Sequence, residues 1–305
     1  MADALTSPSP LIFDRALIRA RRRRADLLGP ATFLLDRVAD ELGERLGTVL
    51  RRFDVALDLG SPGERVAEVL RRLGSVATIV AADAARVAGA RRMSPLVIAD
   101  EEALPFGDGS LDLVVSALAL QFVNDLPGVL VQIRRALRPD GLFLAALVGG
   151  DTLTELRQSF AAAESEIEGG ISPRVAPFAD LRDLGALLQR AGFALPVTDV
   201  DRVTVRYHNA FALMHDLRRM GATNALRDRR RTPLKRATLM HMAEIYAQRF
   251  SDSDGRVRAT FEIVWLSGWA PHPDQQLPLK RGSAQARLAD ALGAREISAG
   301  EKAGR

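Results

Sequence analysis

The sequence predicts an α/β fold built on a mostly parallel sheet, and two observations carry this prediction. From Val55 onward, short apolar runs alternate with helix-like segments, and nearly continuous runs of this length are typical of buried parallel strands. The first run ends in a glycine-containing turn, Asp58-Leu59-Gly60-Ser61-Pro62-Gly63, and the second ends in Asp83. A strand, a glycine turn, a helix and a strand that ends in an acid make one half of a doubly wound nucleotide-binding fold.

The chain before the first strand is predicted to contain a lead and a helical region. Residues 1–10 contain Ser and Pro, and we expect them to be disordered. Residues 11–51 are expected to form helices, because apolar side chains recur there at spacings of about three and four. The residues in this pattern are Leu27, Phe33, Leu34, Val38, Leu42 and Leu46.

Residues 52–150 are predicted to form the cofactor half of the domain. The apolar runs that we interpret as strands lie at 55–59, 78–82, 96–99, 111–116 and 142–148. Helix-like segments lie between them at about 64–73, 84–91 and 127–137. Pro139-Asp140-Gly141 is typical of a turn, which we place before the fifth strand.

Residues 151–283 are predicted to complete the sheet and to form a C-terminal cover. Two alternating segments, Val197–Tyr207 and Ala259–Trp269, are expected to be closing strands that run antiparallel. Helices are expected at 152–166, 180–191, 209–220 and 234–250. The prediction is therefore a seven-stranded sheet with helices on both faces in one domain, 11–283, followed by a flexible tail, 284–305.

Composition limits the classes of function. The absence of Cys excludes disulfides, thiolate metal sites and a Cys nucleophile. Two arginine clusters, 19–24 and 227–231, are interpreted either as solvated surfaces or as contacts to phosphate or an acidic partner. No aromatic residues interleave with them, so nucleic acid is not an expected partner. No apolar run is long enough for a membrane span and no secretory signal is recognisable, which led us to expect a cytoplasmic protein.

The candidate site residues follow successive predicted strands. In an open α/β sheet, ligands bind beyond the carboxyl ends of the strands. Asp83 is expected to accept from ribose hydroxyls and Asp100 from an adenine amino group. Each acid alone is better explained as a helix N-cap, but three acids at the ends of successive strands indicate a ligand site. The cofactor-binding candidates are Asp58, Gly60, Ser61, Gly63, Asp83, Asp100, Glu101, Ser116 and Gln121.

An acid directly before the first glycine suggests that the ligand is S-adenosylmethionine, although the turn is altered. Pro62 removes a backbone N–H and fixes φ. Glu64 adds a negative charge near the expected position of a cofactor carboxylate, which should oppose binding unless an arginine such as Arg65 offsets it. We therefore expect weaker affinity than an intact glycine-rich turn gives, or none.

Five motifs resemble a known family. The segments 99–106, 112–116 and 123–127 are similar to class I S-adenosylmethionine-dependent methyltransferases, which have a Rossmann-type fold. Two later segments, 149–157 and 168–173, resemble the complex I assembly factor family of the arginine-hydroxylase type. The resemblance extends from about residue 11 to residue 283.

The resemblance implies a methyltransferase-like fold with a pocket for S-adenosylmethionine, formed here by Asp58, Gly60, Asp83, Asp100 and Ser116. Mitochondrial members of the family are associated with hydroxylating an arginine of a respiratory complex I subunit. The family's turn has the pattern D-L-G-C-G-x-G, and this chain has Pro and Glu in place of its last two glycines.

Three functions stay open at this point. The first is modification of a protein substrate during complex I assembly, with Asp151, Glu155 and Arg157 as catalytic candidates that equally suit helix capping and pairing. The second is methyl transfer to a small carboxylate or a carrier-bound acyl group. The third is a binding-only assembly factor whose cofactor turn has degenerated. We assign no metal site, because the four His residues lack a ligand spacing.

Overall fold

The computed structural model describes residues 11–84, 93–275 and 293, and its first compact unit is Met1–Pro271. The second unit, His272–Arg305, contributes few described residues. The predicted lead at 1–10 lies outside the described residues, as do nearly all of the helix expected at 84–91 and of the tail expected from 284. These three expectations stay predictions.

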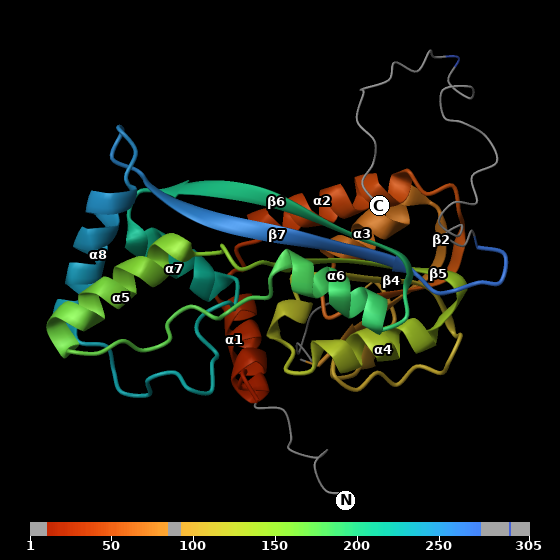
Figure 1. The fold of residues 1–305 in the computed structure, drawn as a ribbon, viewed down its shortest axis with the longest axis horizontal. Coiled ribbons are helices and arrows are strands. Elements are labelled where there is room, and N and C mark those ends of the chain that lie inside the picture. The colour runs from red at the N-terminus through yellow and green to blue at the C-terminus, as the bar shows by residue number, and fades with distance from the viewer. Residues whose placement is uncertain (1–10, 85–92, 276–292, 294–305) are drawn as a thin grey trace, which may run out of the picture. The chain divides into compact units, whose positions relative to one another are not determined.

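Seven strands form one sheet in the order β3-β2-β1-β4-β5-β7-β6 (Figure 1). The pairs β1–β2, β1–β4, β2–β3 and β4–β5 are parallel, whereas β7 runs antiparallel to both β5 and β6. The strands are β1 (Phe53–Leu59), β2 (Val76–Asp83), β3 (Leu96–Ile98), β4 (Leu111–Ala117), β5 (Leu137–Val148), β6 (Ala194–Tyr207) and β7 (Val257–Trp269). The predicted seven-stranded, mostly parallel sheet is confirmed.

Helices cover both faces of this sheet (Figure 1). The helices are α1 (Arg15–Leu27), α2 (Phe33–Gly47), α3 (Arg65–Leu73), α4 (Leu126–Ala136), α5 (Thr154–Glu168), α6 (Leu181–Arg190), α7 (Ala210–Arg219) and α8 (Arg236–Phe250), with a 3₁₀ turn η1 (Leu120–Phe122). Successive side chains of β5 point to opposite faces, as in any strand. Leu142 and Leu144 therefore pack with α2 and α3, and Phe143 and Ala145 pack with α4 and α6.

The N-terminal helical region is divided into α1 and α2. Gly29 adopts a left-handed φ of +75° after α1, and Pro30 follows it. Proline cannot continue a helix from the preceding turn, so the chain changes direction here. Asp14 begins α1 as its N-cap, because its side chain accepts from the backbone N–H of Leu17 at 3.0 Å.

The predicted turn at Pro139-Asp140-Gly141 lies inside β5 rather than before it. Along the β4–β5 pair, Leu111 faces Leu137 but Leu113 faces Leu142, so β5 contains extra residues at this point. Asp140 has a φ of +60°. The turn-forming residues thus make an irregularity that bends a continuous strand, which is why a local pattern placed the strand start five residues too late.

The carboxyl ends of β1, β2, β4 and β5 lie at one edge of the sheet, because these strands are parallel. β1 has β2 on one side and β4 on the other, so the chain order reverses at β1. In doubly wound folds, ligands bind in the crevice at such a reversal. The fold therefore indicates a ligand site beyond Leu59 and Ala117, the last residues of β1 and β4.

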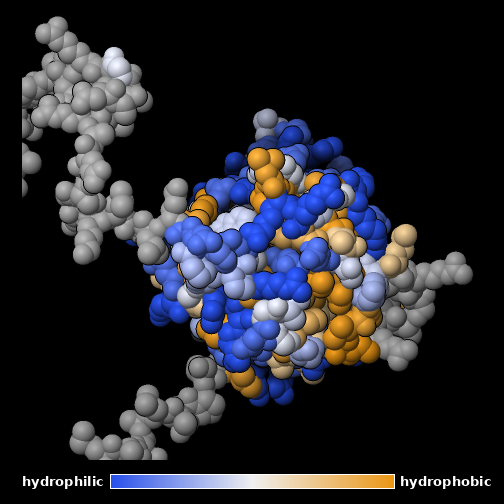
Figure 2. Space-filling view, turned by 90° about the vertical axis from the view of Figure 1, so that its right-hand side faces the viewer, coloured by the Kyte–Doolittle hydropathy of each residue, from blue (hydrophilic) through white to orange (hydrophobic). Residues whose placement is uncertain are grey.

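The surface is mixed in character. Figure 2 shows one side of the molecule, on which hydrophilic side chains predominate and hydrophobic ones gather toward the lower right. Among the described residues, no helix has the length and hydropathy that a membrane crossing requires.

Candidate cofactor site

A cavity of about 400 Å³ lies at the predicted edge, and its wall includes residues that follow β1, β2, β4 and β5. This volume is within the range of about 300–1,000 Å³ that is typical of small-molecule sites. Residues of α1, α2 and the segment after α7 complete the wall. The cavity thus occupies the crevice at which the strand order reverses.

The turn after β1 contributes Pro62, Gly63 and Glu64 to the cavity wall. Gly60 and Gly63 both have a φ of +69°, a conformation that glycine adopts without strain. A Cβ on Gly63 would meet nothing within 4 Å, so a ligand can approach this part of the backbone closely. Gly60 is instead packed tightly, because a Cβ there would lie 2.7 Å from Oε1 of Glu101.

The charge of Glu64 has a partner on α3. Its carboxylate lies 3.3 Å from Nη2 of Arg71, within the same turn and helix. Arg65, the expected partner, pairs with Asp40 at 2.6 Å and with Asp36 at 3.3 Å, both on α2. Glu64 on the cavity wall therefore has a counter-charge in Arg71 of α3, and the partners of Arg65 on α2 are Asp36 and Asp40.

Asp83 is the predicted ribose acid, and it lies buried on the cavity wall at the end of β2. Asp58, predicted for the same cofactor, is buried to 3% exposure and does not line the cavity. Ser61 accepts a hydrogen bond from the N–H of Ala117 at 2.9 Å, and Ser116 donates to the carbonyl of Leu59 at 2.8 Å. Both serines therefore connect the end of β1 to the end of β4, and neither belongs to the cavity wall.

Asp100 and Glu101 are bound by arginines of α1. Arg15 pairs with Asp100 at 2.5 Å and also with Glu101. Arg19 pairs with Asp100 at 3.2 Å, and Arg22 pairs with Glu101 at 3.4 Å. The three arginines recur at i, i+4 and i+7, which places them on one face of the helix. This spacing was visible in the sequence and is the signal that we missed.

These ion pairs alter the environment of the acid predicted to bind adenine. Burial alone raises the pKa of Asp100, but the backbone N–H of Glu102 and the guanidinium of Arg15 outweigh it, so the pKa lies below its usual value. Neither Asp100 nor Glu101 belongs to the cavity wall. Recognition of adenine by Asp100 remains a prediction, and the contact that the structure shows for this carboxylate is to α1.

Two leucines with left-handed backbone lie on the cavity wall. Leu118 follows β4 with a φ of +53°, and Leu153 precedes α5 with a φ of +56°. Bulky residues rarely adopt this conformation, and strained backbone of this kind clusters at functional sites. Gln121, a predicted site residue on the same wall, donates its amide to the carbonyl of Leu118 at 2.7 Å.

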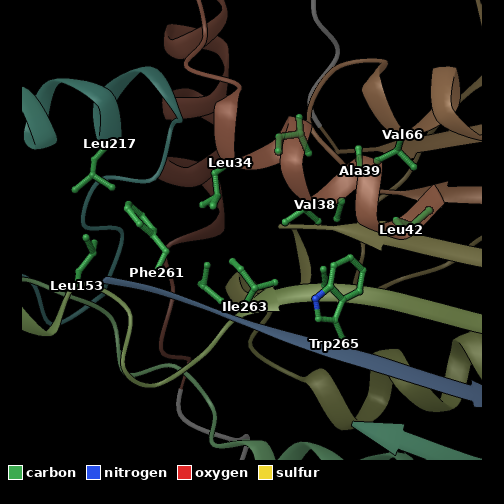
Figure 3. Close-up of a cluster of buried hydrophobic side chains, with 14 of the residues drawn as sticks. Leu34, Val38, Ala39, Leu42, Val66, Leu153, Leu217, Phe261, Ile263 and Trp265 are labelled. Carbon is green, nitrogen blue, oxygen red and sulfur yellow. The ribbon is translucent and has the colours of Figure 1, made fainter. Parts of the chain in front are cut away.

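The other part of the cavity wall is apolar. Leu34 from α2, Leu153, Leu217 from α7 and Phe261 from β7 come together from distant parts of the chain (Figure 3). They continue into the buried core that α2 forms with β7, where Leu42 and Trp265 also lie. The cavity thus combines a turn and an acid on one part of its wall with hydrocarbon on another.

The three catalytic candidates lie outside the cavity wall. The buried carboxylate of Glu155 accepts from the N–H of Thr260 at 3.1 Å and from its hydroxyl at 2.5 Å. Asp151 pairs with Arg202 on β6. Arg157 donates to the carbonyls of Gly150 and Thr152 at 3.1 and 3.2 Å. These contacts suit the structural alternative, and a catalytic role stays a prediction.

The arginine clusters are largely bound within the chain. Arg21 donates to the carbonyl of Thr223 at 2.6 Å, Arg229 pairs with Asp14 at 3.2 Å, and Arg230 pairs with Glu168 at 2.5 Å. The clusters therefore attach α1 and α5 to the segment after α7.

Among residues 11–84, 93–275 and 293, no group of three or more His, Cys, Asp or Glu side chains is arranged to hold a metal ion.

The fold and this cavity define a protein of the class I S-adenosylmethionine-dependent methyltransferase fold. Residues 57–145 match the methyltransferase domain family. The YcgJ protein from Bacillus subtilis, 15% identical, has the same fold with a TM-score of 0.53, over 76% of this chain and 99% of that structure.

A curated relative narrows the assignment further. The mitochondrial arginine-hydroxylase NDUFAF5 of Danio rerio is 40% identical over 92% of this chain and 89% of its own length. The chain belongs to this arginine-hydroxylase NDUFAF5 family. A malonyl-[acyl-carrier protein] O-methyltransferase of Xylella fastidiosa (strain M23) is 36% identical over 76% of this chain and 77% of its own.

The expectation of a cytoplasmic protein was wrong. The NDUFAF5 relative is a mitochondrial protein by name, and it contradicts that assignment. The expectation had rested on the lack of a recognisable targeting segment. Targeting segments are separate from the folded domain and are removed from many mature proteins, so the residues of the folded domain do not indicate the compartment.

Proposed function

We propose that this protein binds S-adenosylmethionine in the cavity and modifies an arginine side chain of a protein substrate during assembly of respiratory complex I. One observation carries the first part: Gly63 and Asp83, from the ends of neighbouring strands, lie on the wall of a single cavity at the reversal of strand order. The name of the 40% identical relative, an arginine-hydroxylase, supports the modification of an arginine. The resemblance of segments 149–157 and 168–173 to the complex I assembly factor family supports the role in assembly.

The residues of the cavity fit this cofactor. The buried carboxylate of Asp83 is placed to accept from ribose hydroxyls. The open space above Gly63 admits a ligand close to the backbone, and apolar side chains such as Leu153 and Phe261 exclude water. When bound, S-adenosylmethionine supplies a cationic sulfonium that carries a transferable methyl group. The wall carries the acids Asp26, Glu64 and Asp83 and also the cations Arg22 and Arg219, so charges of both signs line the cavity.

The carboxylates of the wall are the groups that an arginine substrate would meet in the cavity. A guanidinium presents a planar set of N–H donors that carboxylates bind well. Asp26 is on α1, whereas Glu64 and Asp83 come from the cofactor half, so the acids approach the cavity from two directions. Hydroxylation of an arginine inserts an oxygen atom and therefore consumes an oxidant, which distinguishes it chemically from methyl transfer.

The first test is isothermal titration of the protein with S-adenosylmethionine, beside Asp83→Ala and Asp183→Ala. Asp183 is in the first turn of α6, away from the cavity wall, and serves as a matched control. We expect micromolar binding by the wild type and by Asp183→Ala, and its loss in Asp83→Ala. An absence of heat from folded wild-type protein would instead support the third function, a binding-only assembly factor with a degenerate cofactor turn.

The substrate is tested with purified complex I subunits that are incubated with the protein, S-adenosylmethionine, dioxygen as the oxidant and a two-electron reductant, and are then analysed by mass spectrometry. A mass gain of one oxygen atom on an arginine supports hydroxylation, and a gain of one methyl group on it supports methylation. Loss of the product in Asp83→Ala shows that the modification depends on the cofactor cavity. If no arginine of any subunit changes mass, the arginine assignment fails even where the cofactor binds.

A second candidate function is methyl transfer to a carboxylate of a carrier-bound acyl group. The apolar part of the cavity wall, with Leu34, Leu217 and Phe261, favours it, because hydrocarbon accommodates an acyl chain better than a guanidinium. The malonyl-carrier methyltransferase relative supports it as well. Formation of a malonyl methyl ester from S-adenosylmethionine, followed by liquid chromatography, distinguishes this function from arginine modification.

A further inference from the structure

Gly60, the first glycine of the cofactor turn, is held from three sides. Its N–H donates to the carbonyl of Ala82 at 2.7 Å, which fixes it to β2. Its carbonyl accepts from Nη1 of Arg22 at 3.3 Å. The carboxylate of Glu101 occupies the space above its Cα, 2.7 Å from where a Cβ would lie. Two of these three contacts therefore depend on residues outside the turn and outside β2.

Arg22 itself lies on the cavity wall, and one nitrogen of its guanidinium links two of these groups. Nη1 of Arg22 is 3.3 Å from the carbonyl of Gly60 and 3.4 Å from Oε1 of Glu101. Glu101 is only 2% exposed, and its other oxygen pairs with Arg15. A buried carboxylate is costly unless cations and donors surround it. Removal of the Arg22 side chain would therefore remove both an ion pair of Glu101 and the hydrogen bond to the Gly60 carbonyl.

The backbone of Arg22 is itself fixed by the segment that follows α7. A Cβ on Gly221 would lie 3.1 Å from Cα of Arg22, so the two backbones are in close contact. Next to it, Arg21 donates to the carbonyl of Thr223 at 2.6 Å. At the start of α1, the N–H of Asp14 donates to the carbonyl of Ala225 at 2.9 Å. Helix α1 is therefore clamped between the segment 221–225 and the cofactor half.

We propose that Arg22 is a positioning residue that holds the cofactor turn in its binding conformation through Gly60 and Glu101. This inference rests on the proposed binding of S-adenosylmethionine in the same cavity. A turn with Pro62 and Glu64 in place of two glycines depends on contacts from outside, and α1 supplies them. Helix α1 lies before the 57–145 segment that matches the methyltransferase domain family, yet it belongs to the cofactor site.

The test is the affinity of the full chain for S-adenosylmethionine in Arg22→Met, measured by isothermal titration well below the thermal midpoint of each variant. We expect binding to weaken about tenfold or more, the usual effect of losing a hydrogen bond from a charged donor. Arg23→Met is the control, because Arg23 is an exposed residue on the same helix. Its affinity is expected to equal that of the wild type.

Two further variants separate positioning from general stability. Arg22→Lys keeps the charge but lacks the planar guanidinium, and it serves if Arg22→Met does not fold. Its affinity is expected to lie between those of the wild type and Arg22→Met. Glu101→Gln combined with Arg22→Met should weaken binding less than the two single effects multiplied, because both act on Gly60.

The outcomes are distinct. Wild-type binding with unchanged affinity in Arg22→Met or, where that does not fold, in Arg22→Lys overturns this inference and leaves the proposed function standing, even if the thermal midpoint falls. The inference is also overturned if the loss of affinity in the double variant equals the product of the losses in Arg22→Met and Glu101→Gln. Wild-type protein that is folded and gives no heat overturns the proposed function, and the inference with it.

Discussion

The carboxylate of Glu101 lies against Gly60 so closely that a Cβ on this glycine would be 2.7 Å from Oε1. Gly63, three residues further on, has the same φ of +69° but open space around the corresponding position. The two glycines of the turn thus serve different purposes. Gly60 permits close packing with a buried acid, and Gly63 leaves the backbone open to the cavity.

Substitution of these two glycines by alanine should separate the two effects. Gly63→Ala introduces only the left-handed backbone cost, about 1 kcal/mol. Gly60→Ala adds a steric conflict with Glu101, so its total cost should be at least about 2 kcal/mol. Urea unfolding of both variants measures this difference. Equal free energies of unfolding would show that Glu101 moves away without cost.

Glu155→Ala should lower stability without lowering cofactor affinity. The substitution leaves the N–H and the hydroxyl of half-buried Thr260 without their acceptor, which costs about 1–3 kcal/mol. Asp151→Ala is the matched comparison, because its pair with Arg202 is exposed and contributes about 0–1 kcal/mol. Thermal unfolding and cofactor titration measure both properties. A loss of product formation in Asp151→Ala, at unchanged stability and affinity, would instead establish the catalytic assignment.

Acid should weaken the attachment of α5 to the segment after α7. The hydrogen bond from Thr238, then that from Arg230, lower the pKa of Glu168 to about 2. The unfolded chain has an ordinary glutamate pKa of about 4.3, so ionised Glu168 stabilises the fold above that pH. This contribution is lost as the pH falls from about 4.3 to about 2.

Glu168→Gln tests this dependence. The free energy of unfolding of the wild type should exceed that of the variant near neutral pH, and the two should converge toward pH 2. Glu44→Gln, at an exposed position of α2, is the control and should follow the wild type. A difference between wild type and Glu168→Gln that persists unchanged down to pH 2 would contradict the assignment.

Leu42→Ala should be among the most destabilising single substitutions in α2. Leu42 is fully buried between α2 and the sheet, beside Val38 and Trp265 (Figure 3). Replacing a buried leucine by alanine leaves a cavity and costs about 2–5 kcal/mol. Leu50→Ala, at a fully exposed position, should stay within about 0.5 kcal/mol of the wild type. Denaturant unfolding compares the two variants directly. Similar decreases in the free energy of unfolding would show that burial of Leu42 does not stabilise the core.

Local patterns in the sequence predicted most of the sheet and part of the site. Apolar runs predicted the first five strands, because strands buried on both faces need continuous hydrocarbon, and alternating segments predicted β6 and β7. The irregularity at Asp140 was placed outside β5, since turn-forming residues look the same within a strand and before it. Gly63 and Asp83 were predicted to share an edge, and they share a cavity wall. The reason is that neighbouring parallel strands have their carboxyl ends at the same edge of the sheet.

The sequence by itself determined the alternation of strands and helices, and with it the edge at which Gly63, Asp83 and Gln121 lie. These features follow from hydrocarbon burial and chain direction, both of which are local. Only the tertiary structure decided which acids the arginines bind. Arg22 pairs with Glu101, which is 79 residues away in the sequence, and Arg65 pairs with Asp36 and Asp40 of α2. Long, flexible guanidinium side chains reach many carboxylates, and only packing of the elements selects among them.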